Sequence, residues 1–257
     1  MRHCIFVLIS FIMQSYIASP STDGTIRLLV FTKTNDYRHE VIPVSINALT
    51  GIAELNGWQM TITEDSLMIN AMALDTVSVV VFLHTSGNVL GVEQQDALKN
   101  YVEGGGGLVT VHTGTVTEND WPWFVDAVGA VFTGHPPVQQ GRLIIEDRSH
   151  PATIFLPDSV WVPEDEWYSF DRNPRANVHV LISIDEASYD VDDNRWFPDA
   201  RQRMGDHPLV WCRQVGRGRV FQTALGHEPA LFSNPLFLKH IEGAVKWAAN
   251  IKDCENQ

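Results

Sequence analysis

The sequence predicts an α/β fold, in which helices cover both faces of a doubly wound, mostly parallel sheet in three layers. Apolar segments with strand-like and helix-like spacing alternate along the first half of the 257-residue chain, which is typical of parallel sheets. The run Thr76–Leu83 is almost continuously apolar, as expected for a strand buried on both faces. Prolines and short strand-like runs dominate the second half, so we expect a loop-rich β insertion there.

In the first half, short apolar runs bounded by polar or glycine-containing segments predict strands. Helices are predicted where apolar residues recur every three or four positions, and the helix at 40–56 has Pro43 in its first turn. The glycines Gly104–Gly107 precede a strand instead of following one, so we interpret them as a tight turn and not a phosphate-binding loop. In order, the predicted elements are a strand at 27–32, a helix at 40–56, strands at 58–63 and 76–83, a helix at 92–103 and a strand at 108–111.

The second half is predicted to be less regular. Proline-containing segments and a polar excursion at 187–206 separate short runs with strand character. Gly216-Arg217-Gly218 lies between two such runs, which predicts a hairpin. In order, we expect a short helix at 121–129, strands at 139–146, 178–184, 209–214 and 219–225, and a closing helix at 234–250.

The N-terminal residues are typical of a secretory signal peptide. Arg2 gives a short positive start, residues 4–13 are almost entirely apolar, and the segment up to Ser19 ends in small residues. We therefore expect a signal peptide at 1–19, one domain at 20–257, and export to the periplasm or the extracellular space. The apolar run is too short for a membrane-spanning helix, which needs about 20 residues, and we expect no membrane span elsewhere.

Charge and cysteine content narrow the classes of function. The formal net charge is −13 and the chain has no cluster of Lys or Arg, so nucleic-acid binding is not expected. A neutral small-molecule carbohydrate is compatible with such an acidic surface. Three cysteines are too few for a disulfide framework, although the sequence is compatible with one disulfide between Cys212 and Cys254. Assembly into a homo-oligomer stays open as well.

Histidines follow the predicted parallel strands. His84 and His112 directly follow the third and fourth strands, His227 comes just after the last strand, and His39 follows the first strand by a short loop. Ligands of open parallel sheets bind beyond the carboxyl ends of the strands, so we expect these imidazoles to face one site. Neutral imidazole can transfer a proton or ligate a metal, and the alternative for each one is a structural hydrogen bond.

Acidic and aromatic residues form further candidate groups. The segment Glu164–Tyr168 places three carboxylates beside two aromatic rings, which suits acid–base catalysis, metal binding or sugar stacking, or else a solvated turn. Trp121 follows the fourth strand and offers an aromatic face. His135 and His150 each precede a proline that restricts the backbone, and we expect His150 to be structural only.

Several segments together form a pattern that is specific for one family, among them FTKTNDYRHEVIP, VVVFLHTSGNVL, YVEGGGGLVTVHTG and GRGRVFQTALGHEP. In these segments, and from about Arg27 to Ala249, the chain resembles the ThuA-like (trehalose utilisation) family, whose fold is that of class I glutamine amidotransferases. The resemblance puts His112 where amidotransferases carry their nucleophilic cysteine, and His227 near the place of their catalytic histidine. Glutamine hydrolysis through a thioester needs a thiolate, so we do not expect a glutamine amidotransferase. At His84, family members usually carry Asn.

The family resemblance implies an enzyme of carbohydrate catabolism that acts on an oxidised (3-keto) glycoside or disaccharide. A 3-keto group acidifies the neighbouring C2 proton, so that a base can start elimination, hydrolysis or isomerisation. We expect His112, His227 and His39 to transfer protons, with Glu166 as the acid. No cofactor is certain, but a divalent metal ion would fit, with His112 and His227 as candidate ligands. Sugar-binding roles are expected for Arg38, Trp121, His135, Tyr168 and His84.

Two other functions stay open. The lack of a Cys or Ser nucleophile at position 112 also suits a non-catalytic carbohydrate-binding module on the same scaffold. A metal-dependent glycoside hydrolase is the third candidate. Sugar titrations compared with turnover assays distinguish the binding module from the enzymes, and metal analysis of the purified protein tests the hydrolase.

Overall fold

An eight-stranded, mostly parallel sheet forms the centre of the computed structural model, which describes residues 25–157 and 164–250. The predicted signal peptide and Cys254 lie outside the described residues. The strands of this sheet are β1 (Arg27–Phe31), β2 (Gln59–Thr63), β3 (Val79–Leu83), β4 (Gly107–Val111), β7 (Arg142–Ile145), β10 (His179–Asp185), β11 (Pro208–Val215) and β12 (Gly218–Thr223). Their order is β2-β1-β3-β4-β12-β11-β10-β7. The first five of these are mutually parallel, whereas β11, β10 and β7 each run antiparallel to the strand before them.

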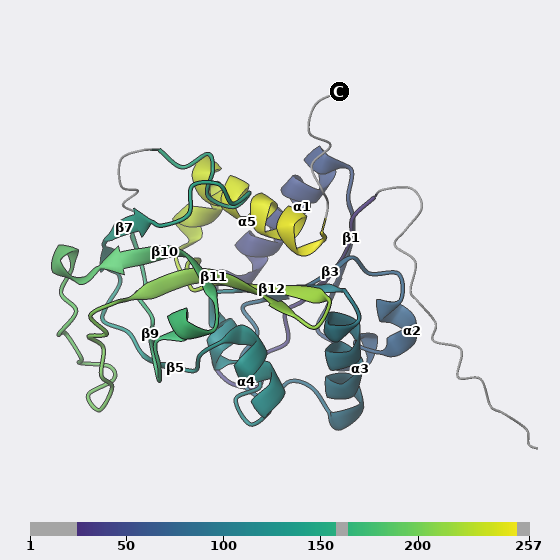
Figure 1. The fold of residues 1–257 in the computed structure, drawn as a ribbon, viewed down its shortest axis with the longest axis horizontal. Coiled ribbons are helices and arrows are strands. Elements are labelled where there is room, and N and C mark those ends of the chain that lie inside the picture. The colour runs from purple at the N-terminus through teal and green to yellow at the C-terminus, as the bar shows by residue number, and fades with distance from the viewer. Residues whose placement is uncertain (1–24, 158–163, 251–257) are drawn as a thin grey trace, which may run out of the picture.

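Helices cover both faces of the sheet, as the sequence predicts (Figure 1). Two pack on one face, α1 (Ile42–Asn56) and α5 (Pro235–Ala248), and contribute to the larger apolar core. The other face carries α2 (Ala71–Leu74), α3 (Val92–Glu103) and α4 (Pro122–Val128). All five residues of β3 between these layers are buried, which confirms the interpretation of its apolar run. Within the described ranges, none of the helices has the length and apolar character that crossing a membrane requires.

The prediction of a single strand at 139–146 is wrong in one respect, because the strand is interrupted at Gly141. β6 (Gln139–Gln140) pairs with β8 (Glu164–Asp165) in a separate small sheet, whereas β7 joins the main sheet. A Cβ atom at Gly141 would lie 2.6 Å from Cδ1 of Ile184, so only glycine lets the backbone approach this closely. A second small sheet pairs β5 (Phe132–Gly134) with β9 (Ser169–Phe170).

The predicted hairpin at Gly216–Gly218 is confirmed, since β11 and β12 pair antiparallel across it. β12 then pairs in parallel with β4, and β4 with β3. The loops that follow these neighbouring strands therefore leave the sheet at the same edge. This topology places the residues after Val111, Leu83 and Thr223 side by side.

Candidate functional site

Three histidines and one glutamate from distant parts of the chain converge at the carboxyl edge of the parallel strands. One potential ligand atom from each of His39, His112, Glu166 and His227 lies within 4.8 Å of the others. The ring centroid of His39 is 4.9 Å from that of His112 and 5.4 Å from that of His227. The structure thus brings together side chains that the sequence placed after three different strands. We call these four residues the histidine cluster.

His112 is held in a strained backbone conformation directly after β4. Its φ of 63° and ψ of −86° lie outside the regions that residues with a side chain prefer, at an energetic cost of about 1–3 kcal/mol. Its backbone N–H donates to the carbonyl oxygen of Thr223 at 2.7 Å, and Nδ1 donates to the carbonyl oxygen of Ala224 at 2.9 Å. In the neutral ring, Nε2 is therefore the atom with the lone pair, and it faces the cluster.

The carboxylate of Glu166 lies at the centre of the site. Its Oε2 atom is 3.1 Å from Nδ1 of His227 and 3.5 Å from Nε2 of His112. Its other oxygen, Oε1, is 3.5 Å from Nε2 of His135. Burial alone would raise the pKa of Glu166, but the contacts with His112 and His227 outweigh burial and hold this pKa below its ordinary value. Glu166 is therefore ionised at neutral pH, and the same carboxylate raises the pKa of His227 above its ordinary value despite burial.

The neighbouring Asp165 fixes the loop that carries His227. Its buried carboxylate accepts three backbone N–H groups, from Gly226 at 2.7 Å, His227 at 2.9 Å and Glu228 at 3.1 Å. Burial raises the pKa of Asp165 to about 6, which still leaves it ionised at neutral pH. The sequence predicts a candidate site in the acidic segment at 164–168, but it carries no signal that Asp165 binds the loop after β12.

Burial keeps two further imidazoles neutral. Desolvation, followed by repulsion from His112 and His227, lowers the pKa of His39 to about 3. The fully buried His84 also has a pKa well below its ordinary value, first because of desolvation. Its ring lies 5.7 Å from that of His112, and neither of its nitrogens has a hydrogen-bond partner among the described residues. His84 therefore belongs to the wall of the site.

His135 and Tyr168 contact the histidine cluster beside Glu166. Nδ1 of His135 donates to the carbonyl oxygen of Pro136 at 2.9 Å, so the lone pair of the neutral ring is on Nε2, which faces Glu166. Burial lowers the pKa of His135. The hydroxyl of Tyr168 donates to Nε2 of His112 at 2.9 Å, and burial raises the pKa of Tyr168 well above its ordinary value. His135 thus stays neutral beside Glu166, and Tyr168 stays protonated.

The donor set of the histidine cluster fits a divalent transition metal such as zinc. Three imidazoles and one carboxylate are ligands that such ions commonly take. The hydrogen bond from Nδ1 of His112 to a carbonyl is the support that metal-binding histidines usually have. Nδ1 of His39 is buried without a hydrogen-bond partner among the described residues. The sequence named His112 and His227 as candidate ligands, and the structure adds His39 and Glu166 to the group.

Two residues expected to bind sugar have other partners in the structure. The exposed guanidinium of Arg38 pairs with Glu64 at 2.6 Å, which directs it to the β2 side. The ring of Trp121 packs 4.8 Å from that of Trp123 and 5.9 Å from that of Phe124, and it contributes to the smaller core. The structure thus favours a packing role for Trp121 and a surface ion pair for Arg38.

His150 and Cys212 pack against each other on the α5 face. His150 is buried between Phe221 and Trp247, with ring centroids 5.9 and 5.3 Å away, and its Nδ1 accepts the N–H of Ala152. This confirms its expected structural role. Cys212 is buried as a free thiol 3.8 Å from Nε2 of His150, and burial raises its pKa to about 12. It is therefore a poor nucleophile.

Comparisons with known structures support the same fold. A structure described as a ThuA-like protein from Bacteroides uniformis matches with a TM-score of 0.70 and 23% identity, over 93% of this chain and 95% of that one. A ThuA-like protein from Parabacteroides merdae matches with a TM-score of 0.70 and 22% identity, over 91% and 93% of the two chains. A β-galactosidase from Bacillus circulans sp. alkalophilus shares the fold with a TM-score of 0.54 and 12% identity, over 88% of this chain and 31% of the enzyme.

Sequence comparisons identify the family. None of the curated proteins compared matches the chain. The model of the ThuA family, described as trehalose utilisation, matches residues 27–248, a range that contains β1 to α5 and every residue of the histidine cluster. The fold of class I glutamine amidotransferases expected from the resemblance is the fold observed. The chain is therefore a member of the ThuA family, which is linked to the use of carbohydrate.

Proposed function

We propose that this protein is a metal-dependent enzyme of carbohydrate catabolism that acts on an oxidised (3-keto) glycoside. The observation that carries the proposal is the convergence of His39, His112, His227 and Glu166 within 4.8 Å at the carboxyl edge of the sheet. The family's link to trehalose utilisation supports a carbohydrate substrate. Export from the cytoplasm, expected from the N-terminal sequence, is part of the same proposal.

The histidine cluster would hold the ion, and the ionised state of Glu166 suits a ligand better than the acid expected from the sequence. A bound divalent ion supplies Lewis acidity, which polarises a ketone and stabilises the negative charge that develops when the adjacent proton leaves. Asp165 keeps the ring of His227 in place by holding its backbone. The carbonyl of Ala224 keeps Nε2 of His112 directed into the site.

His135 is the best candidate for the base that removes the C2 proton. Its neutral ring has its lone pair on Nε2, on the side of Glu166, and lies at the border of the buried cluster. Tyr168 is the best candidate for the donor, because burial keeps its hydroxyl protonated and a metal on Nε2 of His112 would free this hydroxyl to face the substrate. A donor and a base beside one electrophilic centre are what elimination or isomerisation of a keto sugar requires.

The strained backbone of His112 argues against a purely sugar-binding module. A binding protein can hold sugar with surface aromatics and hydrogen bonds, without a non-glycine residue at a φ of 63°. Backbone strain of this kind persists where the surrounding structure enforces it and is concentrated at functional sites. The placement of His112 therefore favours an enzyme over a module.

Metal content and turnover of a 3-keto-glycoside, measured together, test the proposal. We expect His112→Ala and Glu166→Gln to lose bound metal and to reduce kcat/KM by on the order of 100-fold or more. His179→Ala is the matched control, because His179 is exposed and pairs with Asp147 on another part of the surface. Full activity in a folded, metal-free protein would exclude a catalytic role for the metal. Sugar binding without turnover would favour the non-catalytic carbohydrate-binding module.

A further inference from the structure

A large cavity lies next to the histidine cluster. It has a volume of about 660 Å³ and is lined by the segment Trp196–Arg201, by Arg203 and Met204, and by residues at the end of β9. The volume is within the range of pockets that hold small-molecule ligands. None of the four residues of the cluster lines this cavity, so it is a separate compartment.

His135 lies between the cavity lining and the histidine cluster, although it does not itself line the cavity. The ring centroid of His135 is 5.6 Å from that of Trp196 and 4.9 Å from that of Phe197, and both of these residues line the cavity. On its other side, Nε2 of His135 is 3.5 Å from Glu166. The ring that we propose as the base therefore separates the cavity lining from Glu166.

The lining of the cavity combines an aromatic face with polar groups. Trp196 is 54% exposed, which is unusual for so large an apolar side chain. The Nε atom of Arg201 donates to the carbonyl oxygen of Arg203, and its terminal nitrogens have no acidic partner among the described residues. Arg172 pairs with Asp171 and Arg203 with Asp192, whereas the lining carboxylate of Asp199 has no ion pair among the described residues. An aromatic face beside a free hydrogen-bond donor, Arg201, and a free carboxylate acceptor, Asp199, suits a neutral polyhydroxyl ring.

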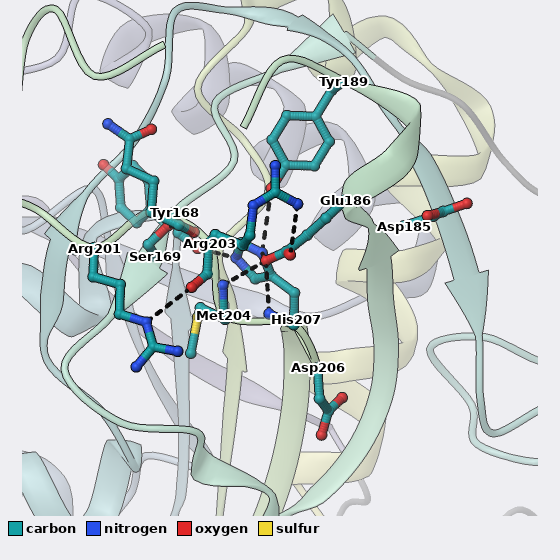
Figure 2. Close-up of polar contacts among 12 residues, drawn as sticks. Tyr168, Ser169, Asp185, Glu186, Tyr189, Arg201, Arg203, Met204, Asp206 and His207 are labelled. Carbon is teal, nitrogen blue, oxygen red and sulfur yellow. Dashed lines mark hydrogen bonds and ion pairs between the residues drawn. The ribbon is translucent and has the colours of Figure 1, made fainter. Parts of the chain in front are cut away.

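A polar network around the buried Glu186 and His207 connects the cavity wall to the backbone of Tyr168 (Figure 2). Glu186 accepts hydrogen bonds from the backbone N–H groups of Met204 at 2.5 Å and Gly205 at 3.0 Å. It also accepts a hydrogen bond from Nδ1 of His207 at 3.0 Å. Nε2 of His207 donates to the carbonyl oxygen of Tyr168 at 2.8 Å. One pair of buried side chains therefore positions both the wall of the cavity and the proton donor of the site.

We propose that this cavity binds the second sugar unit of the glycoside, the one that leaves when the bond to the oxidised sugar is broken. In this arrangement Trp196 stacks on the leaving sugar and Arg201 donates to its hydroxyl groups. The Glu186–His207 pair positions the cavity wall, and with it that sugar, relative to Tyr168. The assignment rests on the proposed function for the choice of sugar, but binding in the cavity does not require turnover.

Binding of unoxidised sugars tests the cavity on its own. Calorimetric titrations would compare trehalose, maltose and cellobiose with methyl glucoside, using wild type, Trp196→Ala, Trp196→Phe and Arg201→Ala. We expect at least one disaccharide to bind about tenfold more tightly than methyl glucoside, and Trp196→Ala to remove this difference while Trp196→Phe keeps most of it. Arg195→Ala is the matched control, because Arg195 is in the same segment but pairs with Asp193 outside the cavity.

The outcomes separate this inference from the proposed function. Disaccharide selectivity that depends on Trp196, in a protein without keto-glycoside turnover, would support the cavity and contradict the enzyme. Turnover of keto-glycosides without any preference for disaccharides would support the enzyme and overturn the cavity assignment. Equal selectivity in wild type and Trp196→Ala, or no binding of any of the three disaccharides, would also overturn it.

Discussion

The carboxylate of Asp165 accepts the backbone N–H of His227 at 2.9 Å, and the next side chain in the chain, Glu166, lies 3.1 Å from the ring of that same histidine. Two consecutive acidic residues thus bind one histidine through its backbone and its side chain. Because both oxygens of Asp165 accept backbone N–H groups of the loop that carries His227, Asp165 acts as a positioning residue for His227.

Replacing Asp165 by Asn should loosen the loop after β12. The amide oxygen can still accept the N–H groups of His227 and Glu228, but the NH₂ group cannot accept that of Gly226. We therefore expect unfolding free energy to fall by about 1–3 kcal/mol and metal affinity to fall by about 10- to 100-fold. Chemical denaturation and metal titration measure the two effects. Glu164→Gln is the control, because Glu164 is the exposed neighbour on β8. Unchanged metal affinity in Asp165→Asn would refute the positioning role.

The backbone strain at His112 can be measured with a pair of variants. His112→Ala and His112→Gly both remove the ring and its hydrogen bonds, but only glycine adopts a φ of 63° without a steric penalty. We expect the glycine variant to be more stable than the alanine variant by about 1 kcal/mol, with both inactive. Equal stability, or a more stable alanine variant, would show that the conformation is not strained.

Arg38 was expected from the sequence to hold sugar, whereas the structure pairs its exposed guanidinium with Glu64. We therefore expect Arg38→Ala to change kcat/KM by less than about twofold and unfolding free energy by less than about 1 kcal/mol. Steady-state kinetics and denaturation of the variant check both values. A large increase in KM with unchanged stability would restore the sugar-binding role.

Acid sensitivity of the fold should depend in part on His240 of α5. This residue is fully buried, its Nδ1 donates to the carbonyl oxygen of Ala152, and desolvation lowers its pKa from 6.5 to about 4. Between these two values the unfolded chain binds a proton that the folded chain does not. The contribution of His240 to stability is therefore complete above pH 6.5 and is lost as the pH falls toward 4.

His240→Gln should weaken this pH dependence. At about 1.4 kcal/mol per pKa unit, wild type should lose about 3 kcal/mol more unfolding free energy than the variant between pH 7 and pH 4. Urea denaturation of both proteins across this range gives the difference. Parallel pH profiles for wild type and variant would mean that His240 is not held neutral in the folded state.

Much of the fold follows from local sequence patterns. The apolar run of β3, the spacing of α3 and the glycines around the hairpin each determine a local conformation, and the structure contains all three. The break at Gly141 was not predictable, because its cause is the close approach of Ile184 and Trp167, which are distant in sequence.

The site was predictable where topology alone determines position. His84 and His112 directly follow parallel neighbouring strands, so their proximity follows from the order of the sheet. The sequence did not distinguish Trp121 from a ligand-binding aromatic, because its packing partners Trp123 and Phe124 also suit a binding surface. The role of Asp165 depends on a contact with the loop after β12, which no local pattern encodes.

Anomalous X-ray diffraction from crystals grown with zinc tests the central claim most directly. We expect one strong peak at the carboxyl edge of the sheet, within bonding distance of His39, His112, His227 and Glu166, and no peak there in Glu166→Gln crystals grown in the same way. An unliganded cluster in zinc-saturated wild-type crystals, or zinc bound only elsewhere on the protein, would contradict the account.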